Sequence, residues 1–299
     1  MIEKLTYINE RGESLEFSTR SPYHTNIPDC TGLSDIYSQI SSAGSAGQDG
    51  ETLVGNRIKI RDIEIVGHIK DRGKIERLRR HSVLNRILNP HYTASLVYEC
   101  GAHKRIISCK VEKGPLITRR GVFEQFTIQL LCLNPYWRDE HEKRTDIALW
   151  LGMFEFPEPD GLMLCDETGW EIEYRAPSLI ENAENTGDVS TGMRVEFRAL
   201  GQLSNPSVLN VNTMQYIRVN IEMIAGDVLT ISTGYGMKAV ELTRSGITTN
   251  AFRHLDIDST YLQLEPGDNL IRYDADLNVE KLEVTIYKHN LYLGAYSWL

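Results

Sequence analysis

The sequence predicts a mainly β protein of two domains. Val, Ile, Thr and Tyr are frequent and alternate with polar residues over many short segments, as in strands. The charge also changes halfway: residues 1–145 carry 22 Lys and Arg against 18 Asp and Glu, and residues 146–299 carry 10 against 23. The aromatic, proline-stopped strand end LCLNPYWRD, residues 131–139, lies near this change. A mildly basic half and a strongly acidic half indicate two domains with different partners.

These observations place an N-terminal domain over residues 1–145 and a C-terminal domain over residues 146–299. Each is long enough to bury its own core. The stretch 146–185 has no clear pattern and contains Pro157, Pro159 and Pro177. We expect it to be a connector or a covering flap.

The N-terminal half predicts a small sheet with one helix. KLTYIN and SLEF, on either side of a turn at 10–13, form an expected hairpin. The Gly/Ser-rich stretch 38–50 is either a flexible loop or a loop that orders only against a neighbouring subunit. In RIKIRDIEIVGHI, residues 57–69, the apolar positions change parity near Arg61, which predicts a bulge or two strands. The strands TASLVY, KRIISCKVEK and VFEQFTIQLLCLN complete the sheet.

Residues 74–88 predict the one helix. Apolar side chains recur there at helical spacing, and Asn89–Pro90 ends the run. The expected buried face consists of Ile75, Leu78, Leu84, Ile87 and Leu88.

The C-terminal half predicts an antiparallel β-sandwich. Eight or nine short β segments, separated by Gly, Pro, Asn and Asp, follow one another with almost no helical period. Ile217, Val219, Ile221 and Met223 form one apolar face, and Leu282, Val284 and Ile286 form another.

No pattern in the sequence supports catalysis, a metal or a cofactor, so we expect a protein that is not an enzyme. There is no Walker loop, no H-E-x-x-H and no G-x-S-x-G elbow. The eight His residues never lie two or four positions apart. The pairs Asp256 with Asp258 and Asp274 with Asp276 could bind calcium or act as paired carboxylates, but they fit turns and strand edges better. The five Cys residues are scattered and are expected to be reduced.

The basic segment 57–86 has three interpretations. It could be a solvated helix face, a contact with an acidic neighbouring subunit, or a surface for nucleic acid. No aromatic platform accompanies it, which disfavours the third. The candidate subunit-interface residues are Arg72, Lys74, Arg77, Arg79 and Arg80.

Some aromatic residues of the second half could stack on sugars, although a core or rim role fits them better. Examples are Trp170, Tyr174, Tyr235 and Tyr261.

A series of motifs runs along nearly the whole chain. An N-terminal hairpin, a QDG loop, RIKIRDIEIVGHI, a helix ending in ILNP and a strand ending in LNPYWRD occur in that order. NTGDVSTGMRVEF follows, then GDVLTIST with KAVEL, then LEPGDNLIRYDAD and a terminal YLGAYSWL. In this order the motifs resemble the distal tail protein (Dit) family of long-tailed, non-contractile phages of Gram-positive hosts.

The resemblance implies a ring, typically of six subunits, at the tip of the tail. N-terminal domains would form the ring around the DNA channel, and galectin-like C-terminal sandwiches would project from it. Implied partners are the chain itself, the tail tube protein, a tail-associated fibre or lysin protein, and a receptor-binding protein. DNA would only pass through the channel, and no membrane would be bound. The expected location is the virion tail tip, after assembly in the host cytoplasm, since no signal peptide is recognisable.

Two other functions remain open. The chain could be a carbohydrate-binding module that takes part in adsorption to the host cell surface, or a hydrolase of an undescribed kind.

Overall fold

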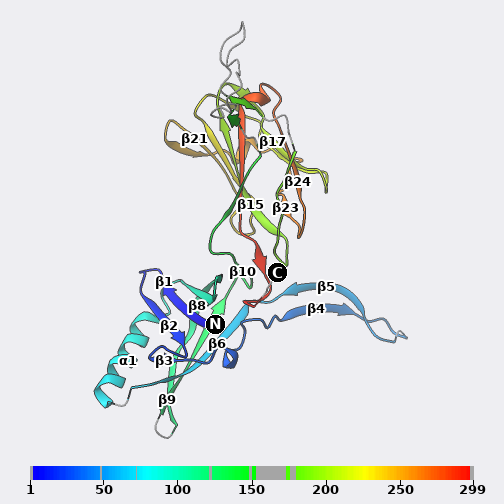
Figure 1. Ribbon diagram of the computed structural model, residues 1–299. Coiled ribbons are helices and arrows are strands. Elements are labelled where there is room, and N and C mark those ends of the chain that lie inside the picture. The colour runs from blue at the N-terminus through cyan, green and yellow to red at the C-terminus, as the bar shows by residue number, and fades with distance from the viewer. Residues whose placement is uncertain are drawn as a thin grey trace, which may run out of the picture. The chain divides into compact units, whose positions relative to one another are not determined.

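The computed structural model describes residues 3–47, 49–71, 73–120, 123–147, 150–152, 173–175 and 180–296. The chain divides into two compact units. The first comprises the described residues of 1–140 and of 291–299, and the second those of 141–290. The fold is mainly β, as predicted (Figure 1).

The first unit is a closed β-barrel. Its strands follow the order β8-β7-β1-β2-β3-β6-β9, and β9 pairs with β8 again. Closure is possible because the long strand β8 bends: its first half pairs with β7, its second half pairs with β9, and its register shifts between Val111 and Leu116. The strands are β1 (Glu3–Asn9), β2 (Ser14–Ser18), β3 (Tyr23–His24), β6 (Arg61–Ile69), β7 (Ala94–Cys100), β8 (His103–Arg120) and β9 (Phe123–Cys132).

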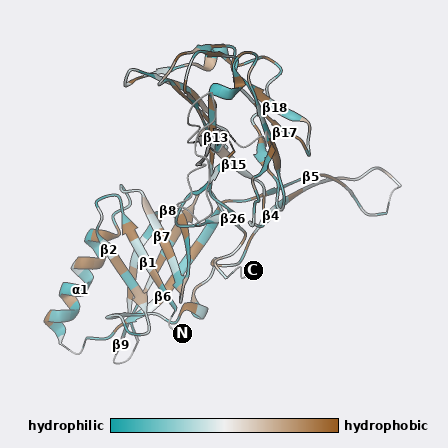
Figure 2. Ribbon diagram, turned by 45° about the horizontal axis from the view of Figure 1, so that its top comes forward, coloured by the Kyte–Doolittle hydropathy of each residue, from teal (hydrophilic) through white to brown (hydrophobic). Residues whose placement is uncertain are grey.

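Apolar and polar residues alternate along the strands of this barrel, and the apolar side chains fill its core. Figure 2 shows this alternation as brown and teal. The rings of Phe17, Tyr23 and Phe126 lie with centroids 5.8–6.2 Å apart in the core. Gly67 lies against this cluster, where a Cβ atom would come 2.4 Å from the Phe126 ring. The predicted hairpin of β1 and β2 is confirmed.

Helix α1 (Lys74–Ile87) packs on the barrel by a narrower face than predicted. Leu84, Ile87 and Leu88 are buried, as expected. Ile75 and Leu78 are 71% and 56% exposed, so their expected burial is wrong. Only the C-terminal part of the helix reaches the barrel core, and its N-terminal part is held by polar contacts.

The Gly/Ser-rich segment 38–50 begins in one strand of a two-stranded arm. Among the strands that the structure describes, β4 (Ser38–Ala43) and β5 (Thr52–Ile58) pair only with each other, with one register shift at Ser41–Ser42. The arm extends away from the barrel (Figure 1). The parity change near Arg61 marks the boundary between β5 and β6, so the two-strand alternative is the correct one.

The chain returns to the first unit at its end, which the predicted boundary at 145/146 did not anticipate. Strand β26 (Leu291–Tyr292) pairs with β10 (Trp137–Arg138), which in turn pairs with β8. Tyr292 and Ala295 are buried in the barrel core. The second unit is therefore inserted between β10 and β26.

The second unit is built from antiparallel strands around a core of its own. The larger sheet has the order β11-β25-β15-β20-β21-β22, with β23 paired to β15; the smaller has the order β14-β24-β17-β18. Two strands of the larger sheet, β15 and β25, alternate strictly between buried and less buried residues. The strands of the two sheets are β11 (Lys143–Asp146), β14 (Ile180–Asn182), β15 (Thr191–Ala199), β17 (Ser207–Asn210), β18 (Gln215–Arg218), β20 (Val228–Ser232), β21 (Ala239–Arg244), β22 (Ile247–Asn250), β23 (Gln263–Leu264), β24 (Leu270–Asp274) and β25 (Leu282–Lys288).

The expected connector 146–185 is partly strand. Its described residues contribute the end of β11, the buried Ile147 and β14 to the second unit. Residues 148–149, 153–172 and 176–179 lie outside the described residues. The remaining short elements are β12 (Trp150–Gly152) with β13 (Glu173–Arg175), β16 (Leu203–Ser204) with β19 (Glu222–Met223), and the 3-10 turns η1 (Ile27–Asp29), η2 (Phe252–His254) and η3 (Val279–Lys281).

The insertion predicts that the second unit can be excised. Arg138 and Leu291 are paired residues of adjacent strands, so joining Glu140 to Leu291 leaves Asp139 and Glu140 as a two-residue turn. We expect this variant, which lacks residues 141–290, to unfold cooperatively in urea. The matched control consists of residues 1–140 without the tail. Its free energy of unfolding should be lower than that of the first variant by about 3 kcal/mol or more, because Tyr292 and Ala295 no longer fill the core. Equal stability of the two variants would contradict the structural role of the tail.

Candidate assembly surfaces

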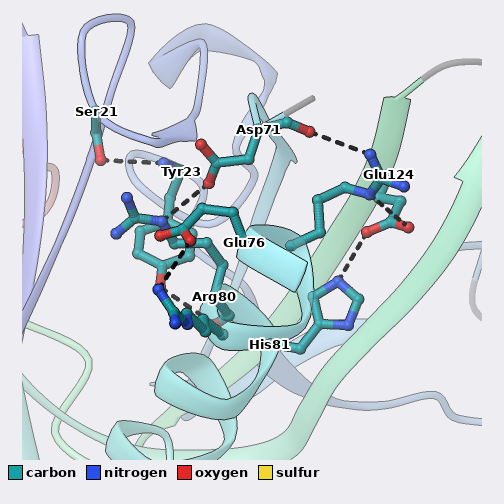
Figure 3. A network of polar contacts seen from close by, with 9 residues as sticks. Ser21, Tyr23, Asp71, Glu76, Arg80, His81 and Glu124 are labelled. Carbon is teal, nitrogen blue, oxygen red and sulfur yellow. Dashed lines mark hydrogen bonds and ion pairs between the residues drawn. The ribbon is translucent and has the colours of Figure 1, made fainter. Parts of the chain in front are cut away.

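Some basic residues of α1 form ion pairs that hold the helix in place, and others face solvent. Arg77 Nε lies 3.2 Å from Glu124 Oε1, and Arg80 Nε lies 3.0 Å from Asp71 Oδ2 (Figure 3). Asp71 raises the pKa of Arg80 through this hydrogen bond. His81 Nε2 lies 2.8 Å from the second Glu124 oxygen. These contacts bind the helix to the chain around it.

The other basic residues face solvent. The Arg79 side chain is 73% exposed and lies 3.3 Å from Glu76, one helical turn earlier. Lys74 is also exposed, and Arg72 lies outside the described residues. Of the five candidate interface residues, Lys74 and Arg79 are therefore the described ones that a neighbouring subunit could reach most readily. The sequence could not separate the two kinds, because Glu124 is distant along the chain.

Substitutions should separate these roles. Arg77→Ala removes the ion pair with the partly buried Glu124, which keeps its contact with His81, and should lower the free energy of unfolding by about 1–2 kcal/mol. Arg79→Ala removes an exposed i,i+3 pair, worth about 0.5 kcal/mol or less. Urea unfolding measures both, and an equal loss in the two variants would refute the division.

The arm β4–β5 is the most prominent surface of the first unit. Every residue of β4 is exposed, and β5 is exposed or intermediate throughout. Ile40, Leu53 and Val54 are 64%, 64% and 69% exposed. An isolated two-stranded ribbon is marginally stable in water. Three large apolar side chains on such a ribbon are typical of a segment that packs against another molecule.

The candidate aromatic residues do not form one platform among the described residues. Tyr235 is 79% exposed, whereas Tyr261 is only partly accessible. The Lys238 ammonium lies 4.6 Å from the Tyr261 ring centre and 5.9 Å from that of Tyr235. Trp170 lies outside the described residues, as does the side chain of Tyr174.

The candidate carboxylate pairs serve the local structure. Asp256 accepts a hydrogen bond from the Asn220 side chain at 3.1 Å and another from the Asp258 N–H at 3.0 Å, and these hydrogen bonds lower its pKa. Asp274 pairs with Arg272, and Asp276 pairs with Arg218. The described residues contain no group of three or more His, Cys, Asp or Glu side chains that could hold a metal ion.

The four Cys residues that the structure describes are buried and free. Burial raises the pKa of Cys30 to about 11 and that of Cys132 to about 12. These thiols are thus poor nucleophiles. In the described part of the chain, no helix is long and apolar enough to cross a membrane.

Comparison with known proteins gives a consistent result for family and fold. Residues 186–288 match the family model described as "Siphovirus-type tail component, C-terminal domain". The crystal structure of Dit from phage SPP1 superposes with a TM-score of 0.68 at 13% identity, over 95% of this chain and 98% of that one. The baseplate of phage P2 in its activated, calcium-bound conformation contains a chain that superposes with a TM-score of 0.52 at 11% identity, over 97% of this chain and 98% of that one. No curated protein matches the sequence. The fold is thus that of Dit proteins.

Proposed function

We propose that the chain is the ring-forming hub of a phage tail tip, because residues 186–288 match the C-terminal domain of siphovirus-type tail components and the fold is that of Dit proteins. The SPP1 protein is described as a paradigm of the hub adsorption apparatus in phages that infect Gram-positive bacteria. The ring would join the tail tube to the tail-associated fibre or lysin protein and to receptor-binding proteins. Six copies follow from the family resemblance.

The arm is the observation that carries the assembly proposal. A closed ring needs a heterologous interface, in which one surface of each subunit meets a different surface of the next. The arm offers such a surface, because it has apolar side chains and free strand edges but no core of its own. The arm of one subunit would pack on the first unit of its neighbour, and the chain would be a structural protein without catalytic activity.

Charge contributes less than the arm to this interface. Arg79 and Lys74 could meet acidic groups of a neighbour, but exposed ion pairs are individually worth about 0–1 kcal/mol. Burial of an exposed Ile, Leu or Val side chain is worth about 1.5–3 kcal/mol. Ring assembly should therefore depend strongly on the arm and only modestly on salt.

A triple substitution in the arm tests this proposal. Ile40→Ser, Leu53→Ser and Val54→Ser together should convert rings into single subunits, as measured by analytical ultracentrifugation. Fold stability should not change, because all three side chains are exposed. The matched control is Ser38→Ala with Asn56→Ser, which alters polar arm residues and should leave the rings intact. Rings that persist in the triple variant would contradict the role of the arm, and a wild-type chain that stays monomeric at high concentration would contradict the ring itself.

A further inference from the structure

The second unit has an unprotected strand edge at β22. This four-residue strand is the last of the larger sheet and, among the described strands, pairs only with β21, which is labelled in Figure 1. All four of its residues are exposed, and its sequence, Ile-Thr-Thr-Asn, carries no charge. The terminal strands β11, β14 and β18 of the two sheets each include a charged residue. Charged residues on edge strands oppose pairing with other chains. The two-residue strand β23, which pairs with β15, is also uncharged, but its Leu264 is buried, so among the described strands of the two sheets β22 is the uncharged edge strand that is exposed throughout.

The hairpin fixes which backbone groups of β22 point outward. Ser245 and Gly246 both have positive φ and form a two-residue turn, so Arg244 and Ile247 are a hydrogen-bonded pair. Since hydrogen-bonded and non-hydrogen-bonded pairs alternate, the N–H and C=O groups of Thr248 and Asn250 point away from β21. The described residues offer these four groups no backbone partner.

The core does not extend under this strand. Leu242 of β21 is 8% exposed and faces the core, and its partner on β22 is Thr249. Ile247 has the same parity as Thr249 and so lies on the same side of the sheet, yet it is 68% exposed. Phe252, just beyond β22 in η2, is 53% exposed. Another strand added at this edge would cover Ile247 and extend the core.

We propose that β22 docks an extended strand of a partner polypeptide, which adds to the larger sheet by antiparallel or parallel pairing. The unit from 141 to 290 carries 24 Asp and Glu against 12 Lys and Arg, so two copies of it repel each other. This charge disfavours a second copy of the unit as the occupant, and we assign the edge to a strand of a different protein, with alternating apolar residues and basic residues nearby. The inference rests on the proposed function in one respect, namely that the partner is found in the assembled tail.

Hydrogen exchange of the Thr248 and Asn250 amides tests the proposal in the free full-length chain and in purified tails. We expect both amides to exchange at least tenfold more slowly in tails. Equal exchange in the two samples would overturn the inference but leave the proposed function intact, whereas tails that lack the chain would overturn both. If the two amides of the free chain exchanged more slowly at higher protein concentration, two copies of the chain would be pairing with each other. That result would also overturn the inference.

Two variants separate backbone pairing from side-chain effects. Thr248→Pro removes one outward N–H, which an edge strand tolerates, and should abolish the protection of Asn250 in tails. Thr248→Val also loses the hydroxyl contact with Thr243 but keeps the N–H, and should behave like the wild type. Protection of Asn250 that is the same in both variants would contradict strand addition. If the proline variant does not fold, the comparison of hydrogen exchange between the free wild-type chain and purified tails still tests the inference.

Discussion

The buried guanidinium of Arg61 holds together the segments that close the first unit. Only 3% of this residue is exposed, and its donors point at backbone carbonyls from three parts of the chain. Nε donates to Pro135 O at 2.7 Å, Nη1 donates to Gly32 O at 2.7 Å, and Nη2 donates to Leu293 O at 2.5 Å. Burial lowers the pKa of Arg61, but an arginine stays charged in a folded protein. Carbonyl dipoles thus stabilise the charge by direct hydrogen bonds, and the Asp35 carboxylate also favours it.

This contact explains the insertion of one unit into the other. The loop that holds Gly32, the turn before β10 and the returning tail all meet at Arg61, although they are far apart in sequence. Gly32 has a φ of +81°, and a Cβ atom there would lie 1.9 Å from the Asp62 carbonyl oxygen, so no other residue fits. Trp137 Nε1 donates to Leu33 O at 3.0 Å beside it. The two strands that flank the inserted unit in sequence, β10 and β26, are therefore held together at one corner of the barrel.

The sequence predicts much of this fold because most strands alternate between buried and exposed residues. Periodicity identified β1, β2 and the longer strands of the second unit, such as β15 and β25, but not the short strand β22; the parity change near Arg61 marked the start of β6. It could not show that the tail returns to the first unit, because YLGAYSWL looks the same in either location. It misjudged Ile75 and Leu78, since helical spacing does not reveal where the barrel ends. It also could not pair Arg77 with Glu124, and the Gly/Ser content of 38–50 concealed a paired arm.

The most direct test of the central claim is immunoelectron microscopy of the phage with an antibody raised against this chain. The account predicts label at the end of the tail that lies away from the capsid, and at no other place on the particle. Label along the tail tube or on the capsid, or particles that lack the chain altogether, would contradict the assignment of this protein as the tail-tip hub.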